Sequence, residues 1–127
     1  MPIKYERDRE VQGMINNIAD TLGLKHLKQG RVVGVRSTGS KSRRILARCW
    51  AMSKVFQTAF EQPPAYVIEV IDHRWEKLSA EDKEKLVIHE LLHIPKCFGG
   101  GLRPHKGCVT GAAVNKIYEE YTKRKNL

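Results

Sequence analysis

The sequence has few features that would tie the chain to a membrane or to an oxidising compartment. It contains only three cysteines, an odd number that does not indicate a disulfide framework. No apolar run approaches the roughly 20 residues that a membrane-spanning helix needs. The start of the chain, residues 1–8, is charged and lacks the apolar stretch of a signal peptide. We therefore expect a cytoplasmic protein that does not bind membranes.

Repeats, low-complexity tracts and linkers are also missing from the sequence. The chain has 127 residues, a length that suits one compact domain, and an apolar fraction of 41% is enough for a single core. We expect one domain over residues 1–127.

Charge is unevenly divided, with 23 lysines and arginines against 14 acidic residues and a net charge of +9. Such a balance favours acidic partners, of which nucleic acid is the commonest. Lys41, Arg43 and Arg44 form a dense basic cluster, followed by Arg48 and Trp50, that could contact phosphates and stack a base. The alternative is a solvated basic hairpin beside a core tryptophan.

The most informative motif is His89-Glu90-Leu91-Leu92-His93, which reads H-E-x-x-H. Histidines four residues apart lie on one face of a helix and can reach the same metal ion. The glutamate beside the first histidine can take a proton from a metal-bound water. The residues in and beside this motif, 86–88, 91–92 and 94, make it the most apolar stretch of the chain, which indicates a buried helix. Buried polar side chains need partners, and a metal ion would be a partner for the two histidines and the glutamate. The motif predicts a zinc hydrolase, most often a peptidase.

A catalytic zinc ion usually takes three protein ligands and keeps one position for water. His105 is the best third ligand, because the run Gly99–Gly101 lets the backbone turn back toward the helix and Pro104 stiffens the approach. One alternative is a carboxylate from the last helix, that of Glu119 or Glu120. The other is a thiolate, that of Cys97 or Cys108, and a thiolate ligand would indicate a structural rather than a catalytic zinc site.

The spacing of apolar residues and of helix-ending residues predicts most of the secondary structure. Gly23 is expected to end the first helix, Ser79 to cap the H-E-x-x-H helix, and Pro95 to mark its boundary. We expect helices around 11–22, 55–60, 80–94 and 113–121, and strands at 31–36, 45–51 and 65–71.

Two segments together resemble a known group of proteins. The run His89–Pro95, followed by Gly101–Lys106, is similar to metallopeptidases of archaea and phages, from about Arg31 to the end of the chain. The wider resemblance is to SprT-like zincins, which include the Spartan-type proteases acting on DNA–protein crosslinks. SprT-like proteins often follow the third histidine with glycine, whereas Lys106 intervenes here, and the chain has no room for their added zinc ribbon.

The resemblance implies an α+β, zincin-like fold, in which a small twisted β-sheet packs on helices that include the H-E-x-x-H helix. It implies one zinc ion held by His89, His93 and His105, with Glu90 as general base in peptide hydrolysis. Substrate would be a protein or peptide added to an edge strand, for which the segment 65–71 is a candidate; the alternative is an internal core strand.

The sequence does not decide which residue stabilises the oxyanion or which reaction the site performs. Arg103, Tyr66 and Tyr118 are candidates for stabilising the oxyanion, although each could instead be structural or solvated. Two other functions would use the same residues: a zinc-dependent nucleic-acid hydrolase, and a non-catalytic nucleic-acid-binding module with a structural zinc ion.

Overall fold

The computed structural model describes residues 2–127 and shows an α+β protein with a small mixed sheet. The strands are β1 (Lys4–Arg7), β2 (Arg31–Thr38), β3 (Ala47–Ala51) and β4 (Ala65–Ile71). The helices are α1 (Arg9–Leu22), α2 (Lys25–Gln29), α3 (Lys54–Ala59), α4 (Asp72–Trp75), α5 (Ala80–Leu92) and α6 (Gly111–Lys125).

The four strands are ordered β1-β2-β4-β3 across the sheet. β2 and β4 run parallel, with Val33 opposite Val67, while β1 and β3 are antiparallel to their neighbours. β4 is therefore an internal strand. Of the two alternatives for 65–71, the structure shows the internal core strand and excludes the substrate-binding edge, because β2 and β3 occupy both of its sides. The edge nearest the H-E-x-x-H helix is β3.

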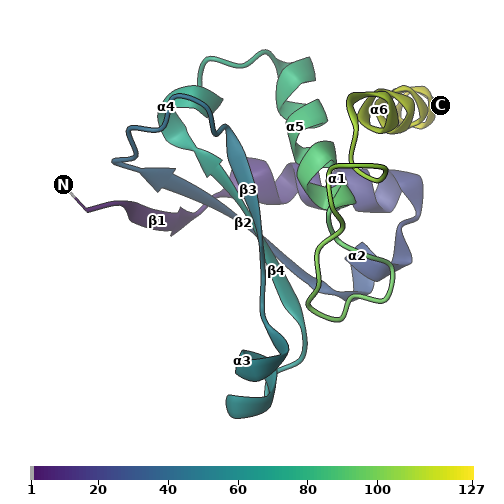
Figure 1. Ribbon diagram of the computed structural model, residues 1–127. Helices are drawn as coiled ribbons and strands as arrows, with labels where there is room; N and C mark the ends of the chain where they lie inside the picture. Colours follow the sequence, from purple (N-terminus) through teal and green to yellow (C-terminus); the bar gives the residue numbers. More distant parts are fainter. Residues whose placement is uncertain (1) are drawn as a thin grey trace.

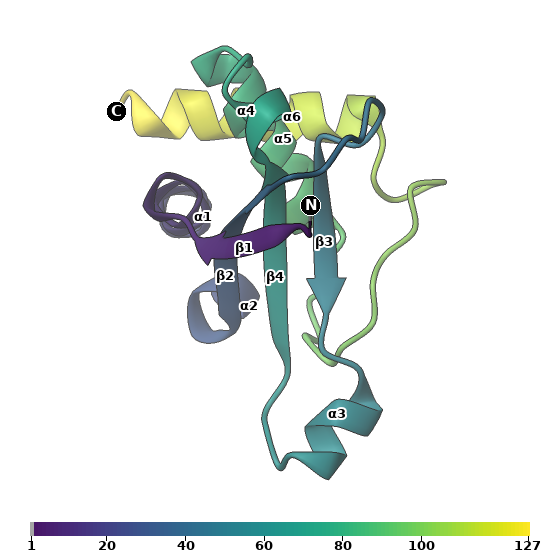
Figure 2. The same cartoon turned by 90° about the vertical axis from the view of Figure 1, so that its left-hand side faces the viewer.

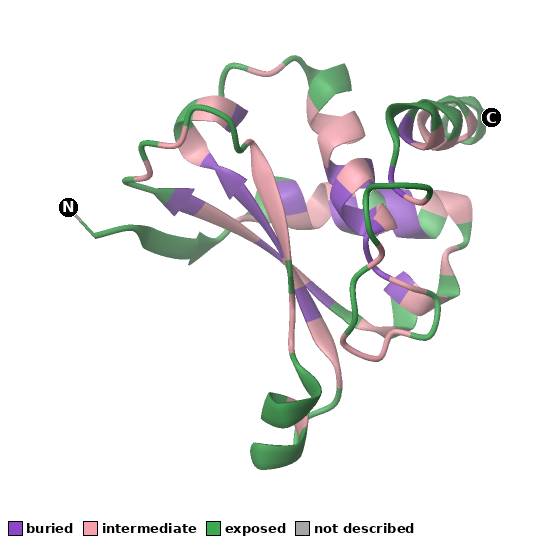
Figure 3. Ribbon diagram, viewed as in Figure 1, coloured by how far each residue is buried: buried purple, intermediate pink, exposed green. Residues whose placement is uncertain are grey.

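The helices α1, α5 and α6 lie on one side of this sheet (Figure 1). After a turn of 90° about the vertical axis, which brings the left-hand side of Figure 1 to the front, the strands stand before these helices (Figure 2). Alternate residues of β4 point into the layer between sheet and helices, where Tyr66, Ile68 and Val70 are fully buried. The buried residues form a band between the two layers (Figure 3).

α5 is fixed to this core by its apolar side. Val87, Ile88 and Leu91 are buried, and each such side chain contributes roughly 1.5–3 kcal/mol of transfer free energy. The hydroxyl of Ser79 accepts a hydrogen bond from the amide of Asp82, which confirms the predicted cap. The helix ends at Leu92 rather than at Ile94, because the chain tightens so that the Ile94 amide donates to the Leu91 carbonyl, three residues back.

β1 was not expected, and β2 continues two residues beyond the predicted 31–36. The two differences have one cause, since β1 pairs with the end of β2 and places Lys4 opposite Thr38. All four residues of β1 are exposed, so they show no buried alternation from which a strand could be predicted.

Arg36, on β2, joins the sheet to two helix N-termini. Its guanidinium contacts the carboxylates of Asp8, which caps α1, and of Glu10 in the first turn of α1. On the other side it contacts Asp72 and Glu76 of the α4 region. The carboxylates raise the pKa of Arg36 against the opposing effect of burial, so this arginine stays charged in the fold.

α3 forms where apolar spacing predicts a helix, yet its apolar residues do not enter the core. Val55, Phe56 and Phe60 are 76%, 57% and 65% exposed. The two phenylalanine rings stack on each other with centroids 5.8 Å apart.

None of the helices among residues 2–127 combines the length and apolar character that crossing a membrane requires.

Candidate metal centre and active site

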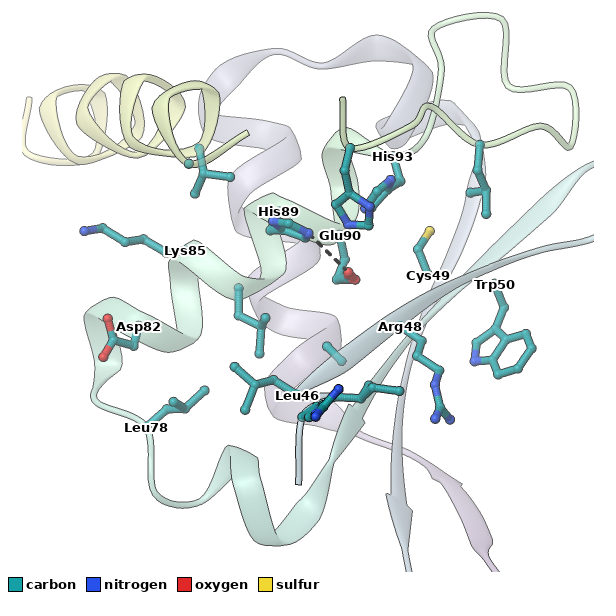
Figure 4. A pocket seen from close by; sticks show the side chains of 18 of the residues that line it. Leu46, Arg48, Cys49, Trp50, Leu78, Asp82, Lys85, His89, Glu90 and His93 are labelled. Carbon is teal, nitrogen blue, oxygen red and sulfur yellow. Dashed lines mark ion pairs between the residues drawn. The ribbon is translucent and has the colours of Figure 1, made fainter. Parts of the chain in front are cut away.

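The two histidines and the glutamate of the motif lie on the side of α5 that faces β3. Because Ile88 and Leu91 are held in the core, the side chains of His89, Glu90 and His93 project toward the strand (Figure 4). The ring centroids of His89 and His93 are 5.2 Å apart. The spacing of four residues thus places both imidazoles on one face, as predicted.

His105 joins these two histidines from the loop after α5. Its ring centroid lies 4.5 Å from that of His93 and 5.2 Å from that of His89. One ligand nitrogen from each of the three rings can be chosen so that all lie within 4.8 Å of one another. Three imidazoles in this arrangement can hold a metal ion, and the set suits zinc.

The loop that carries His105 is joined to the end of α5 by two hydrogen bonds. The amide of Arg103 donates to the carbonyl oxygen of His93 at 2.7 Å. In return, Nδ1 of His93 lies 2.6 Å from the carbonyl oxygen of Arg103. A carbonyl oxygen can only accept, so Nδ1 carries the proton and Nε2 keeps its lone pair for a metal ion.

Tyr66 anchors an earlier part of the same loop. Its hydroxyl accepts a hydrogen bond from the amide of Gly100 at 2.9 Å and donates to the carbonyl oxygen of Gly101 at 2.8 Å. The ring is fully buried, in edge contact with Phe98. Because the loop backbone occupies its hydroxyl, Tyr66 positions the loop. The sequence left two roles open for this residue, stabilising the oxyanion or a structural role, and the contacts are those of the structural role.

Gly100 is required at its position for two reasons. Its φ of 111° lies in the region that favours glycine, and a Cβ there would come within 2.6 Å of the Gln57 side chain and 2.8 Å of the Met52 carbonyl oxygen. Gln57 itself donates to the carbonyl oxygens of Met52 and Gly99. The glycine run therefore turns the loop back, as expected, and α3 and β4 hold it there.

Glu90 is buried beside the histidines without a full set of partners. It is 5% exposed, its Oε1 lies 4.0 Å from Nε2 of His89, and its Oε2 has no hydrogen-bond partner among residues 2–127. Burial raises the pKa of Glu90 to about 7. A carboxyl group with a pKa in this range can both accept and release a proton near neutral pH.

The electrostatics of the site favour neutral imidazoles. Burial lowers the pKa of His89, and the positive charges that His93 and His105 would carry lower it further. A neutral ring is the form that binds a metal ion, so at neutral pH His89 is in the form a ligand needs.

A groove of about 900 Å³ passes the three histidines between β3 and the helices α5 and α6. Cys49 points into it from β3, beside Glu90, and burial raises the pKa of its thiol to about 12, so the thiol stays protonated. The sequence did not indicate that Cys49 or Asn115 would line this groove, because both come from elements distant from the motif.

Among residues 2–127 the cluster consists of His89, His93 and His105, and the other proposed ligands are not part of it. Glu120 forms an ion pair with Arg124 at 2.7 Å on the surface of α6, and Glu119 is exposed. Cys97 is exposed and Cys108 is half-buried. The tyrosine ring of Tyr118 lies under the ammonium group of Lys85, at 5.0 Å.

The basic cluster lies in the exposed loop before β3. Lys41, Arg43 and Arg44 are all exposed, and Arg44 lines the same groove as the histidines. One residue of the cluster, Arg44, therefore reaches the groove that also passes the histidines, although the two are far apart in sequence. Trp50 is 49% exposed rather than a core residue, and its indole NH donates to the buried carboxylate of Glu69 at 2.7 Å.

Comparison with known families gives one match, which covers almost the whole chain. The family model described as "Putative phage metallopeptidase" matches residues 3–122. No curated protein and no solved structure gives a significant match.

Proposed function

Because the chain belongs to this phage metallopeptidase family, we propose that it is a zinc-dependent peptidase with a zincin-like arrangement of sheet and H-E-x-x-H helix. The observation that carries the proposal is the meeting of three imidazoles from two segments next to a buried glutamate. In the proposal His89, His93 and His105 bind one zinc ion, and Glu90 is the general base.

The residues present suit a zinc ion on two independent grounds. Three imidazoles, with no fourth protein ligand from the described part of the chain, correspond to the donor set of a catalytic rather than a closed structural site. Glu90 Oε2 is buried without a hydrogen-bond partner in the described chain, as expected for a group whose partner is a water or substrate atom at the centre. When bound, zinc would supply Lewis-acid chemistry that acidifies water and polarises a peptide carbonyl.

Glu90 performs the proton transfers in this proposal. Its carboxylate takes a proton from the attacking water and then delivers that proton to the amine that leaves. A cation nearby favours the ionised carboxylate, which offsets part of the effect of burial on its pKa. Nδ1 of His93, held by Arg103, keeps one ligand ring oriented while this happens.

The free edge of β3 provides a place for an extended peptide. The Met52 amide donates to Ala65 and the Ile71 amide donates to Leu46, so alternate residues of β3 use their backbone groups toward β4. Ala47, Cys49 and Ala51 therefore direct their amides and carbonyls away from β4. Adding a substrate strand there would lay its backbone along the groove.

Replacing Glu90 tests the proposed reaction. With zinc-loaded protein and an unfolded protein such as casein, we expect Glu90→Gln to lose roughly 100-fold or more in rate while keeping its zinc content. Glu81→Gln, on the exposed start of the same helix, is the matched control and should keep full activity.

The other outcomes of this experiment separate the alternatives. Comparable proteolysis by wild type and Glu90→Gln would remove Glu90 from the mechanism. Cleavage of nucleic acid in the absence of protein substrate would indicate the nucleic-acid hydrolase. Stoichiometric zinc with no hydrolysis of either substrate would indicate a module with structural zinc.

We also propose that nucleic acid contacts the basic cluster of Lys41, Arg43 and Arg44. What supports this is their exposure, the net charge of +9, and the half-exposed indole of Trp50 on the following strand. Binding through phosphates releases counterions, so affinity should fall steeply as salt concentration rises.

Titrating labelled single- and double-stranded DNA at two salt concentrations tests this second proposal. Replacing all three cluster residues with alanine should flatten the salt dependence by about one unit per lost phosphate contact. Replacing the three exposed lysines Lys77, Lys116 and Lys123 with alanine removes the same net charge elsewhere and is the control. Identical slopes for wild type and the triple variant would rule out this binding surface.

A further inference from the structure

The groove beside the histidines has an apolar wall that the proposed chemistry does not use. On one side of His89 and Glu90, the groove is lined by Leu46 from the segment before β3, Leu78 from the loop before α5, and Leu86 from α5. All three are only partly buried, and Leu78 and Leu86 pack against the core. We call this part of the groove, closed by Ala47 of β3, the apolar chamber.

Ala47 controls the depth of the chamber. Its side chain lies on the same face of β3 as that of Cys49, two residues on, and both pack toward the helices. A methyl group at this position leaves open the space between β3 and Leu86. A longer side chain would fill it.

Charged side chains also line the groove around these leucines. Arg44 comes from the loop before β3, Arg48 from β3, and Asp82 and Lys85 from the first half of α5. Lys85 is paired with Glu81 at 3.1 Å. The three leucines themselves present only carbon atoms to a substrate side chain that lies between them.

We propose that the chamber binds a large apolar side chain of the substrate, carried by a residue next to the scissile bond. This inference rests on the proposed peptidase function and adds its substrate class. A strand that pairs with Ala47 and Cys49 alternates its own side chains, so every second one points toward α5. The one nearest Glu90 has the chamber in front of it.

The chemistry of the chamber sets the size of the expected preference. An apolar pocket discriminates between side chains by roughly 10- to 200-fold for each methylene gained or lost. A leucine or phenylalanine should therefore be preferred over alanine at this position by at least about 10-fold.

Two variants should change this preference in opposite directions. Ala47→Leu fills the chamber and should reduce the preference for leucine over alanine by about 10-fold or more. Leu46→Ala enlarges it and should move the optimum toward tryptophan. Ala59→Leu adds the same atoms on exposed α3, away from the groove, and should leave the preference unchanged. Zinc content should be the same in all three variants.

The experiment first identifies cleaved bonds in casein by mass spectrometry and then compares synthetic peptides that differ at one residue beside the bond. The same peptides are also titrated against zinc-loaded Glu90→Gln protein, so that affinity reports the preference even without turnover. Peptide binding with no apolar preference in wild type, or a preference unmoved by Ala47→Leu, would overturn the inference. Absence of hydrolysis together with selective binding would contradict the peptidase function and leave the chamber in place.

Discussion

His93 and Arg103 hold each other through two reciprocal hydrogen bonds. The backbone amide of Arg103 donates to the His93 carbonyl at 2.7 Å, and the imidazole Nδ1 of His93 donates to the Arg103 carbonyl at 2.6 Å. One contact fixes the chain where α5 ends, and the other fixes the tautomer of the ring. Because His105 follows only two residues later, the same pair also brings the third imidazole to the first two.

Removing the third imidazole should weaken metal binding without unfolding the protein. His105 is exposed and contributes little to the core, so His105→Ala should keep its thermal stability in the metal-free state. We expect its zinc affinity to fall by about 100-fold, measured by competition with a chelating dye. His73→Ala, a histidine replacement outside the cluster, is the control. Full zinc affinity in His105→Ala would place the third ligand elsewhere.

Tyr66→Phe should loosen the loop that carries His105. The change leaves the Gly100 amide and the Gly101 carbonyl without their partner, at a cost of about 1–3 kcal/mol. We expect a roughly 10-fold loss of zinc affinity together with faster hydrogen exchange in residues 99–105. Tyr5→Phe removes an exposed hydroxyl and should change neither measurement. If Tyr66→Phe lowers stability but leaves zinc affinity unchanged, Tyr66 does not position the ligand loop.

Glu90 should destabilise the metal-free protein as pH rises. The pKa of Glu90 is about 7 in the folded protein, against the ordinary value of 4.5 that applies to the unfolded chain. The folded state therefore loses stability as pH rises from about 4.5 through 7. In the presence of chelator, Glu90→Gln should therefore be more stable than wild type by roughly 2–3 kcal/mol at pH 8. Urea unfolding at pH 8 and at pH 4.5 measures this, and the difference should be small at the lower pH. An equal difference at both values would contradict the prediction.

Glu10 should contribute stability with the opposite dependence on pH. The hydrogen bond from the Trp75 indole, together with Lys83 and Arg36, holds the pKa of Glu10 below its usual 4.5. Its contribution is present above pH 4.5 and is lost as pH falls through the lower, folded pKa. Glu10→Gln should be less stable than wild type at pH 7, and the two should converge in acid.

The size of the Glu10 effect is expected to be small, because its side chain is 42% exposed and solvent screens the charge. Unfolding curves collected between pH 3 and pH 7 are the measurement. Replacement of the exposed Glu6 by glutamine is the control. A constant gap between Glu10→Gln and wild type over this range would exclude the ionic contribution.

Features set by local sequence could be predicted, whereas those set by the pairing of distant segments could not. The spacing of His89 and His93, the cap at Ser79 and the strand 65–71 follow from helix and strand periods, and the structure has all three. The approach of His105 to the other two histidines was predicted because Gly99–Gly101 allow the chain to turn back and Pro104 stiffens the segment before the histidine. The position of β4 inside the sheet depends on β3 joining its other side, and no local pattern encodes that.

The lining of the groove could not be predicted for the same reason. Leu46, Leu86 and Asn115 come from three separate segments of the chain, and no local pattern marks any of them as a lining residue. Their meeting beside Glu90 results from how α5 and α6 pack over β3. The exposure of Trp50 has a similar origin, because its neighbours Cys49 and Ala51 pack against the core and the indole therefore lies on the opposite face of β3.

α3 links the metal centre to a part of the fold that should open easily. None of its six residues is buried, so its transient unfolding exposes little apolar surface and should occur far more often than global unfolding. Each opening also withdraws Gln57 from the Gly99 carbonyl, at the start of the loop that carries His105. Thermodynamic linkage then works in both directions: a bound metal ion should slow amide exchange in α3, and a ligand that holds α3 closed should tighten metal binding.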